Sequence, residues 1–365
     1  MGTQLESFQV RRDALTTARR IENAAPEPAD GEIVLRLDRF AFTANNITYG
    51  VFGDAIGYWR FFPPTPADWE SGWGVIPVWG FADVVASAHQ AIPEGERIYG
   101  YWPPATHALM RPDRVSPSRF LDASPHRAEL PGGYNWYTRV GAEPSYRRDG
   151  DDRRALLAPL HLTSFCIWDQ LKAADWRGAR RIVILSASSK TSIGLAFALA
   201  RDPDAPEVVG LTSARSLDFV SGLGFYGSCL SYDALDDLDA DIPTVVVDMS
   251  GAAPILGGLH RVLGENLIHC LNVGATHWRD GGDHPDVNQE RSEFFFAPGH
   301  IARRIKEWGP EEFDRKSAGF LADSVAESAR WLQVREVSGL AGLEQRYASV
   351  CAGEAPPEEG LIVAL

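Results

Sequence analysis

The stretch "RIVILSASSKTSIGLAFALA", residues 181–200, decides the fold of this chain. It begins with a β-branched apolar run at 182–185, typical of a buried strand, and continues into small apolar residues that predict a helix over 191–202. A dinucleotide-binding fold carries a glycine-rich turn between two such elements. Here the turn is "SASSKTS", residues 186–192, where hydroxyl groups and one lysine replace the glycines.

Two other kinds of strand-to-helix turn are excluded by the glycines they need. A Walker-type phosphate loop also places Lys-Thr at the start of a helix, but it requires glycines at the positions of Ile184 and Ser189. A serine-hydrolase elbow requires glycines two residues before and two residues after its serine, and no serine of this chain has both.

Two interpretations of the turn remain open. In the first, the N–H groups at the helix N-terminus bind a pyrophosphate, and Ser188, Ser189, Lys190 and Thr191 supply further donors and a charge. In the second, the serines cap the helix and the turn faces solvent. We expect the first, because the turn joins a buried strand to a helix at a position where anions bind.

The second strand of the unit indicates which cofactor would fit. An NAD-binding fold places an acidic residue about 20 residues after the loop, where it holds the ribose 2′-hydroxyl. This chain has "GLTSARS" there, with Ser213 and Arg215 and no acid. An arginine beside hydroxyls suits a 2′-phosphate, so the sequence predicts NADP(H), although a solvated helix start would carry the same residues.

The order of elements predicts two domains. A strand at 31–43 opens a region rich in glycine, proline and aromatic residues, which favours short strands and turns. The charged piece at 144–154 is the expected boundary. Beyond it, five short apolar runs alternate with helices expected at 191–202, 215–224 and 252–264, and this alternation predicts an α/β fold with a doubly wound parallel sheet. Residues 300–333 read as helical, and "GLIVAL" as a final strand.

Composition limits the partners. The net charge of −14, from 35 basic and 49 acidic residues, argues against nucleic acid and against an anionic membrane. The start has no apolar core of a signal peptide, no apolar run reaches transmembrane length, and the four cysteines form no CxxC pair. We expect a cytoplasmic protein that acts on a small molecule.

Several segments together resemble a known superfamily. The chain resembles the quinone-oxidoreductase and enoyl-reductase branch of the medium-chain dehydrogenases/reductases, and more closely an uncharacterised bacterial group of unknown function related to it. The segments that carry the resemblance are "GEIVLRLDRFAFTANNITYG", "EGERIYGY", "LTSFCIWDQL", "SASSKTSIGLAFALA", "VVVDMSG", "VGATHW", "FFFAPGHIARRIKEWG" and "VSGLAGLEQRY". This resemblance implies a β-rich GroES-like catalytic domain over 1–150, a Rossmann-type domain over 155–290 and a segment 291–365 that returns to the first domain. Relatives are commonly dimers, so a homodimer is also expected.

The resemblance also assigns the cofactor site. Besides the loop residues and the pair at 213 and 215, it implies contacts from residues that follow the third, fourth and fifth strands: Tyr232, Asp248, Ser250, Val273 and Gly274. The family's glycines fall on Lys190, Thr191 and Ile193, and Gly194 sits one position late. "NNITYG" and "VWGFAD" stand where the zinc-dependent branch has its ligands, so no metal is expected.

In zinc-free relatives a hydride adds to the β-carbon of an activated alkene, and a tyrosine or water protonates the α-carbon. The resemblance places this tyrosine at Tyr58, with Tyr49 as the reserve, and a phenol near pKa ~10 is protonated at neutral pH. Packing of Tyr58 in a small aromatic core is the alternative. Asn46 either orients the substrate or the nicotinamide ribose, or is an ordinary turn residue. In the segment "THWRDGGDHPD", residues 276–286, His277 is a candidate for polarising the substrate. The alternative interpretation is that the segment is a solvated loop.

These features predict an NADP(H)-dependent, zinc-independent oxidoreductase that acts on an apolar or aromatic enone, quinone or ketone. The degenerate glycine loop keeps two alternatives open. One is a non-catalytic protein that binds a nucleotide or metabolite, and the other is a lyase or isomerase that uses the same fold.

Overall fold

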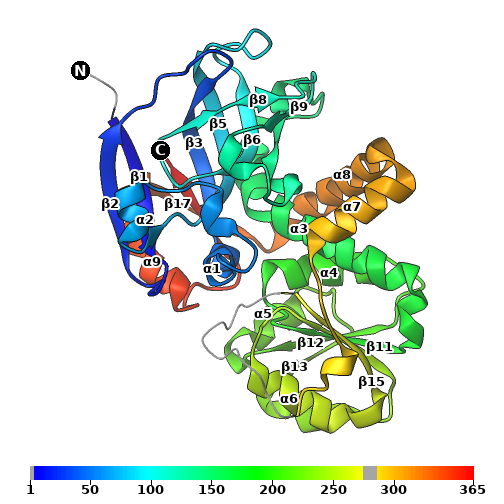
Figure 1. Ribbon diagram of the computed structural model, residues 1–365. Coiled ribbons are helices and arrows are strands. Elements are labelled where there is room, and N and C mark those ends of the chain that lie inside the picture. The colour runs from blue at the N-terminus through cyan, green and yellow to red at the C-terminus, as the bar shows by residue number, and fades with distance from the viewer. Residues whose placement is uncertain (1–3, 274–285) are drawn as a thin grey trace. The chain divides into compact units, whose positions relative to one another are not determined.

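The computed structural model describes residues 4–273 and 286–365, which divide into two compact units (Figure 1). The first unit comprises Met1–Leu156 and Gln333–Leu365, and the second comprises Leu157–Leu332. The division falls inside helix α3 (Asp151–Ala173). Of the C-terminal segment expected to return to the first domain, residues 333–365 belong to the first unit and residues 291–332 to the second.

The first unit is β-rich. Among the described residues its large sheet has the strand order β17-β18-β3-β5-β6-β10-β9-β8, with β7 paired to β3, and its small sheet has the order β2-β1-β4. All these pairs are antiparallel except β17 with β18. The strands are β1 (Gln4–Arg11), β2 (Ala18–Ala24), β3 (Ile33–Phe42), β4 (Trp73–Gly74), β5 (Val78–Ser87), β6 (Arg97–Trp102), β7 (His107–Met110), β8 (Pro112–Asp113), β9 (Arg119–Asp122), β10 (Trp136–Arg139), β17 (Gln333–Ser338) and β18 (Glu359–Ala364).

Short helices connect these strands. The region after β3, for which short strands and turns are expected, also contains the helices α1 (Ala44–Val51), η1 (Tyr58–Arg60) and α2 (Pro66–Glu70). Further 3-10 turns are η2 (Pro125–Arg127), η3 (Gly132–Asn135), η4 (Val140–Ala142) and η5 (Arg148–Gly150). The C-terminal helix α9 (Gly339–Cys351) is tied to the N-terminal segment, because the Tyr347 hydroxyl donates to the Leu15 carbonyl at 2.6 Å and its ring packs edge-on to Phe8.

An arginine with a largely buried side chain anchors the start of α3 to the large sheet. Arg97, in the "EGERIYGY" segment, donates to Asp38 at 2.6 Å, to Asp151 at 2.7 Å and to Asp83 at 3.0 Å. These carboxylates raise the pKa of Arg97 against the opposing effect of burial. The carboxylate of Asp151, the first residue of α3, thereby has a cationic partner in spite of its burial.

The second unit contains the predicted parallel sheet. Its strand order is β13-β12-β11-β14-β15-β16 within the described residues, and every pair is parallel. The strands are β11 (Arg181–Leu185), β12 (Glu207–Thr212), β13 (Ser228–Ser231), β14 (Thr244–Asp248), β15 (Leu267–Asn272) and β16 (Ser292–Phe294). Counted along the chain this is the order 3-2-1-4-5-6 of dinucleotide-binding sheets. The prediction is confirmed, and β16 adds a strand that the five apolar runs did not indicate.

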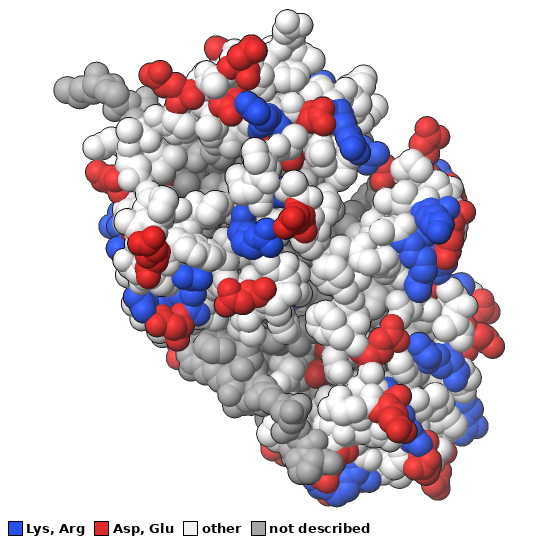
Figure 2. All heavy atoms as spheres, viewed as in Figure 1, with Lys and Arg blue, Asp and Glu red and all other residues white. Residues whose placement is uncertain are grey.

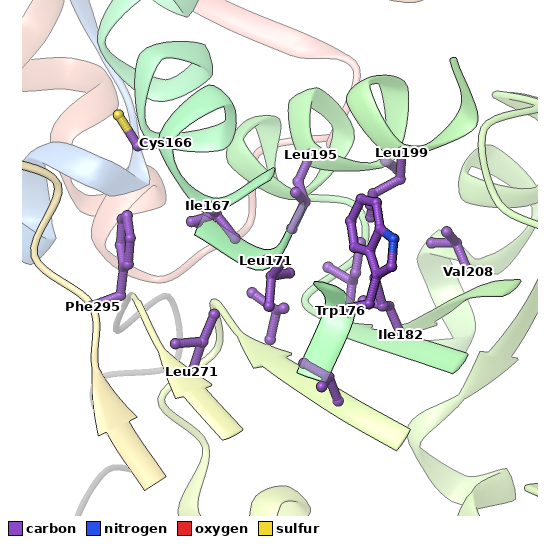
Figure 3. Packing of buried hydrophobic residues seen from close by; sticks show 14 of the residues in the cluster. Cys166, Ile167, Leu171, Trp176, Ile182, Leu195, Leu199, Val208, Leu271 and Phe295 are labelled. Carbon is purple, nitrogen blue, oxygen red and sulfur yellow. The ribbon is translucent and has the colours of Figure 1, made fainter. Parts of the chain in front are cut away.

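Alternate side chains of the central strands enter two separate cores. Ile182 and Ile184 of β11 pack in one core with Leu195 of helix α4 (Lys190–Ala200) and with Leu171 of α3 (Figure 3). Val183 and Leu185 lie in the other core. That second core contains Leu256, Leu259 and Leu263 of helix α6 (Ala253–Leu263). Burial on both faces explains why these strands are continuously apolar.

The helical segment expected at 300–333 is two helices, α7 (Ala297–Trp308) and α8 (Pro310–Glu327). Gly309 has φ +84, which a glycine adopts without strain, and Pro310 then starts the second helix. Phe313 of α8 and Phe295 before α7 are buried in the same core as α3 and β11. This apolar contact keeps residues 291–332 in the second unit.

Short elements complete the second unit. They are η6 (Asp175–Gly178), η7 (Ala214–Ser216), α5 (Leu217–Gly222), η8 (Tyr232–Asp237), η9 (Gly264–Asn266), η11 (Gln289–Arg291) and η12 (Ser328–Arg330). Acidic and basic side chains are interspersed over the face drawn in Figure 2, as on a solvated surface. Among the described residues, no helix has both the length and the apolar character needed to cross a membrane.

Candidate functional site

The strand order indicates the ends of β11 and β14 as the candidate ligand site of the second unit. These strands are neighbours, and the chain leaves them toward opposite halves of the sheet. In open α/β sheets, ligands bind at such a switch point, outside the carboxyl ends of the strands. The turn at 186–189 follows β11, and Asp248 is the last residue of β14 and is followed by residues 249–250.

The turn after β11, which we call the serine loop (residues 186–189), is bonded to its surroundings. Ser186 is left-handed, with φ +52, where dinucleotide loops use glycine. Its N–H donates to the hydroxyl of Tyr232 at 2.9 Å. The Ala187 N–H donates to the Leu211 carbonyl at 2.9 Å, and the Ala187 carbonyl accepts the hydroxyl of Tyr226 at 2.7 Å. The backbone of the loop therefore already has protein partners at these two residues.

The helix after the loop begins with a serine cap. Ser189 is the N-cap of α4, and its hydroxyl accepts the Ser192 N–H at 3.2 Å and contacts the Ser192 hydroxyl at 2.8 Å. Lys190 and Thr191 form the first turn and are partly exposed, as is Ser188. The serine cap is thus confirmed as local structure. Phosphate binding by Ser188, Ser189, Lys190 and Thr191 stays a prediction.

The glycine that the sequence places one position late packs α4 against α3. A Cβ at Gly194 would lie 2.7 Å from both the His161 ring and the Ser164 hydroxyl. Ser164 donates to the Thr191 carbonyl at 2.7 Å, which fixes the first turn of α4. His161 Nδ1 lies 2.9 Å from the Ser324 hydroxyl of α8, and burial lowers the pKa of His161 to about 3. The helix start is held by a neutral histidine and a serine.

The pair that predicts NADP(H) lies at the end of β12. Ser213 precedes the short helix η7, and its hydroxyl contacts that of Ser216 at 3.3 Å. Arg215 is exposed on η7. An exposed guanidinium one turn after the second strand is in the place where a 2′-phosphate would meet it, and the assignment stays a prediction.

The remaining cofactor candidates that the structure describes lie at the ends of β13, β14 and β15. Asp248 is buried, and its Oδ1 accepts the Ser250 N–H at 2.7 Å, the Ser250 hydroxyl at 2.5 Å and the Gly251 N–H at 3.2 Å. The Val273 N–H donates to the Asp248 carbonyl at 2.8 Å. Burial raises the pKa of Tyr232 to about 12, and the Asp248 carboxylate contributes to the rise. These residues therefore contact one another near the ends of β14 and β15.

Gly274 and His277, with most of the polar segment 276–286, lie outside the described residues. Among the residues that are described, no group of three or more His, Cys, Asp or Glu side chains is arranged to hold a metal ion. The family's zinc positions fall in α1 and β5, where Asn46 and the segment at 78–83 are found.

The catalytic candidates of the first unit meet in an aromatic group. Tyr49 of α1 and Tyr58 of η1 have ring centroids 4.7 Å apart. Tyr101 of β6 and Tyr134 of η3, neither of which the sequence indicated, join them with centroids 4.9 Å apart. The Tyr58 and Tyr134 centroids are separated by 5.5 Å. We call these four residues the tyrosine cluster.

The hydroxyls of the tyrosine cluster have different partners. Those of Tyr58 and Tyr134 lie 2.8 Å apart, and the Tyr49 hydroxyl accepts the Trp79 indole N–H at 3.1 Å. The Tyr101 hydroxyl is buried and has no hydrogen-bond partner among the described residues. Burial raises the pKa of Tyr49 to about 12 and raises the pKa of Tyr58 further. The phenols are therefore protonated throughout the neutral range.

The Asn46 side chain caps α1 and binds the backbone before β5. Its side-chain oxygen accepts the Thr43 N–H at 2.7 Å, which caps α1, and its amide nitrogen donates to the Pro77 carbonyl at 2.9 Å. This is the turn role that was one of its two interpretations. Contact of Asn46 with substrate or ribose stays a prediction.

Some of the residues that form the site had weak signals in the sequence. Gly210 interrupts an apolar strand, and a Cβ there would lie 2.9 Å from the Tyr226 ring and 3.1 Å from Ala187. A lone glycine in a strand indicates such a close approach. Tyr101 and Tyr134 carry no periodic signal, because their contacts with Tyr58 join segments far apart in the chain.

Comparison with known families identifies the family to which the chain belongs. The model of the family described as "Protein of unknown function (DUF2855)" matches residues 40–356. The chain belongs to the DUF2855 family. A search of curated proteins finds no match for this DUF2855 protein.

Solved structures share the fold of the DUF2855 protein at low sequence identity. CurA from Vibrio vulnificus is 13% identical over 99% of this chain and 98% of its own, with a TM-score of 0.62, and its complex with NADPH is 12% identical over 98% of both chains, with a TM-score of 0.61. Mycobacterial Rv1454c complexed with NADPH is 14% identical over 99% of this chain and all of its own, with a TM-score of 0.60. The quinone oxidoreductase from Coxiella burnetii is 11% identical over the whole of both chains, with a TM-score of 0.56. The protein thus has the medium-chain dehydrogenase/reductase-like fold, with a Rossmann-type and a GroES-like domain.

Proposed function

We propose that this DUF2855 protein is an NADP(H)-dependent, zinc-independent oxidoreductase that reduces an apolar or aromatic enone, quinone or ketone. The observation that carries the proposal is the 3-2-1-4-5-6 parallel sheet, whose switch point is followed by a helix N-terminus and by the exposed Arg215. Solved structures of the same fold include two proteins in complex with NADPH, and this supports the choice of cofactor.

The residues at the switch point fit a dinucleotide with an altered loop. The partly exposed first turn of α4, with Lys190 and Thr191, would face the pyrophosphate, and Ser213 with Arg215 would hold the 2′-phosphate. When bound, the cofactor supplies a hydride. The loop backbone at Ser186 and Ala187 keeps its protein partners, so side chains would supply donors that glycine loops take from the backbone.

The chain's own contribution to the chemistry is a proton donor in an apolar setting. Tyr58 is only 5% exposed, and burial keeps its pKa above that of a free phenol. A buried phenol donates a proton to an enolate oxygen or carbon that becomes more basic as the hydride adds. The surrounding rings of Tyr49, Phe61 and Tyr101 favour a planar apolar substrate.

Titration with NADPH and with NADH, followed by tryptophan fluorescence, tests the cofactor. We expect saturable quenching with NADPH and at least tenfold weaker binding of NADH. Oxidation of NADPH at 340 nm with 1,4-naphthoquinone and with trans-chalcone then tests the reaction, and dialysis against a chelator should leave the rate unchanged. Binding of neither nucleotide would contradict the proposal, and stoichiometric zinc in the active protein would contradict its metal-free part.

A second candidate function is favoured by one observation. The backbone of the serine loop is bonded to Tyr232, Tyr226 and Leu211, and this departure from a glycine loop keeps a protein that binds a nucleotide or metabolite without catalysis as the second candidate. NADPH binding without oxidation by any carbonyl compound would favour this candidate.

A further inference from the structure

The hydroxyl pair of the tyrosine cluster joins a buried phenol to a partly exposed one. Tyr58 and Tyr134 lie 76 positions apart in the chain, on η1 and η3, and their oxygens are 2.8 Å apart. Tyr58 is 5% exposed, whereas Tyr134 is of intermediate exposure and follows the exposed Gly132 and Gly133. A proton that leaves Tyr58 is therefore replaced most directly along this hydrogen bond.

Of the phenols around Tyr58, the one that forms a hydrogen bond with it is Tyr134. The titratable side chains around Tyr58 are the phenols of Tyr49, Tyr101 and Tyr134. The Tyr49 hydroxyl is engaged by Trp79, and the Tyr101 hydroxyl has no hydrogen-bond partner in the described part of the chain. The hydrogen bond from Tyr134 favours the ionised form of Tyr58 and so opposes the rise in its pKa that burial causes.

We propose that Tyr134 acts with Tyr58 as one proton donor and returns the proton to Tyr58 from water. This inference rests on the proposed function. It assigns a further catalytic-site residue that the sequence does not indicate. Tyr134, a residue of intermediate exposure, connects the buried donor to solvent and stabilises the phenolate that donation leaves behind.

After hydride addition to an enone, the substrate is an enolate, and its α-carbon uses the enolate electron pair to form a bond to the Tyr58 proton. The electron pair of the broken O–H bond stays on the Tyr58 oxygen as a phenolate. Tyr134 passes its proton to that oxygen, and water protonates Tyr134. Each turnover takes up one proton from solvent and one hydride from NADPH.

The test compares Tyr134→Phe with Tyr99→Phe as a matched control. Tyr99 lies on β6, the strand that carries Tyr101, and its buried hydroxyl has no partner among the described residues, so its removal takes away a phenol oxygen without breaking a hydrogen bond. We expect Tyr134→Phe to lower kcat for 1,4-naphthoquinone and trans-chalcone at least tenfold, with KM and NADPH affinity within twofold. Tyr99→Phe should keep kcat within twofold.

Two further readouts separate a proton relay from a structural role. The solvent deuterium isotope effect on kcat should rise in Tyr134→Phe, because proton return becomes slower, and an added buffer acid should restore part of the rate. The double variant Tyr58→Phe/Tyr134→Phe should be no slower than Tyr58→Phe, since residues that act as a unit are not additive.

Each outcome decides the inference. An active wild-type protein whose Tyr134→Phe variant keeps its kcat and isotope effect overturns the relay and leaves the proposed function standing. A variant that changes only KM and NADPH affinity also overturns it. Wild-type protein that binds NADPH but reduces no carbonyl compound overturns the proposed function and the relay with it. If Tyr134→Phe fails to fold, 3,5-difluorotyrosine at position 134 keeps the ring and hydroxyl, and a rate unaffected by its greater acidity overturns the relay.

Discussion

The serine loop and the tyrosine cluster are both rich in hydroxyl groups, but their polar groups are hydrogen-bonded to different extents. In the loop, the N–H of Ser186 and both backbone groups of Ala187 have protein partners. In the tyrosine cluster, two hydroxyls bond only as a pair, and that of Tyr101 has no partner among the described residues. A buried polar group without a partner costs about 1–3 kcal/mol in the free energy of folding.

The difference indicates where ligand chemistry is concentrated. A loop whose backbone is already bonded can offer a ligand only its side chains and the first turn of α4. In the tyrosine cluster, the Tyr101 hydroxyl has no partner to give up among the described residues, and the Tyr58 hydroxyl is bonded to that of Tyr134. The following variants test the two regions against each other, in order of decreasing effect.

The largest effect is expected at Tyr58. Tyr58→Phe should lower kcat by about a hundredfold or more, because it removes the general acid. The wild-type rate should not fall near pH 10, where a free phenol ionises, because burial raises the pKa of Tyr58. Steady-state NADPH oxidation between pH 6 and 11 measures both the loss of kcat in the variant and the pH dependence of the wild-type rate. A Tyr58→Phe variant with wild-type kcat would show that the cluster is only packing.

Lys190→Ala tests the side-chain donors of the loop. Loss of a charged contact to the pyrophosphate should weaken NADPH binding by about 1.5–3 kcal/mol, or roughly ten- to a hundredfold. Fluorescence titration measures the affinity, with thermal unfolding as the control for folding. An unchanged affinity in a protein that still binds NADPH would mean that the phosphates sit elsewhere.

Arg215→Ala distinguishes the two nicotinamide cofactors. The variant should bind NADPH at least tenfold more weakly and NADH almost as well as before, because only the 2′-phosphate meets the guanidinium. Parallel titrations with both nucleotides measure the ratio. Equal losses of affinity for NADPH and NADH would show that Arg215 does not contact the 2′-phosphate.

Tyr232→Phe should have the smallest effect, and it acts on stability. The buried Ser186 N–H would lose its partner, at a cost of about 1 kcal/mol in the free energy of unfolding. Urea denaturation of wild type and variant measures this. A variant that is equally stable and binds NADPH more tightly would mean that Tyr232 competes with the cofactor for this donor.

The sequence predicts the second unit far better than the tyrosine cluster, for a physical reason. Continuous apolar runs such as 182–185 indicate doubly covered parallel strands without any knowledge of distant contacts, and α4 was predicted to within two residues at each end. Residues 300–333 were predicted to be helical, and the Gly309-Pro310 pair divides this segment into α7 and α8. Strand β16, three residues long, is too short for any period.

The tyrosine cluster depends on contacts that no local pattern records. Tyr58 was identified by resemblance, but its partner Tyr134 lies in a glycine-rich turn whose composition indicates only a loop. Aromatic residues that pack across the β-rich unit follow its strand pairing, and the sequence alone did not determine that pairing. The same holds for Tyr226 and Tyr232, whose hydroxyls close the serine loop from later segments of the chain.

The buried histidine under α4 links the folding of the second unit to proton binding. His161 keeps a pKa of about 3 in the folded protein because burial disfavours its charged form, whereas in the unfolded chain it titrates near ~6.5. Between these values the unfolded state binds a proton that the folded state excludes, so this histidine lowers stability as the pH falls from about 6.5 toward 3, by at most about 1.4 kcal/mol per pH unit. Above pH 6.5 both states are neutral at this site and the penalty disappears. Acidification should therefore lower the stability of the second unit, in which α3, α4 and α8 meet at this histidine.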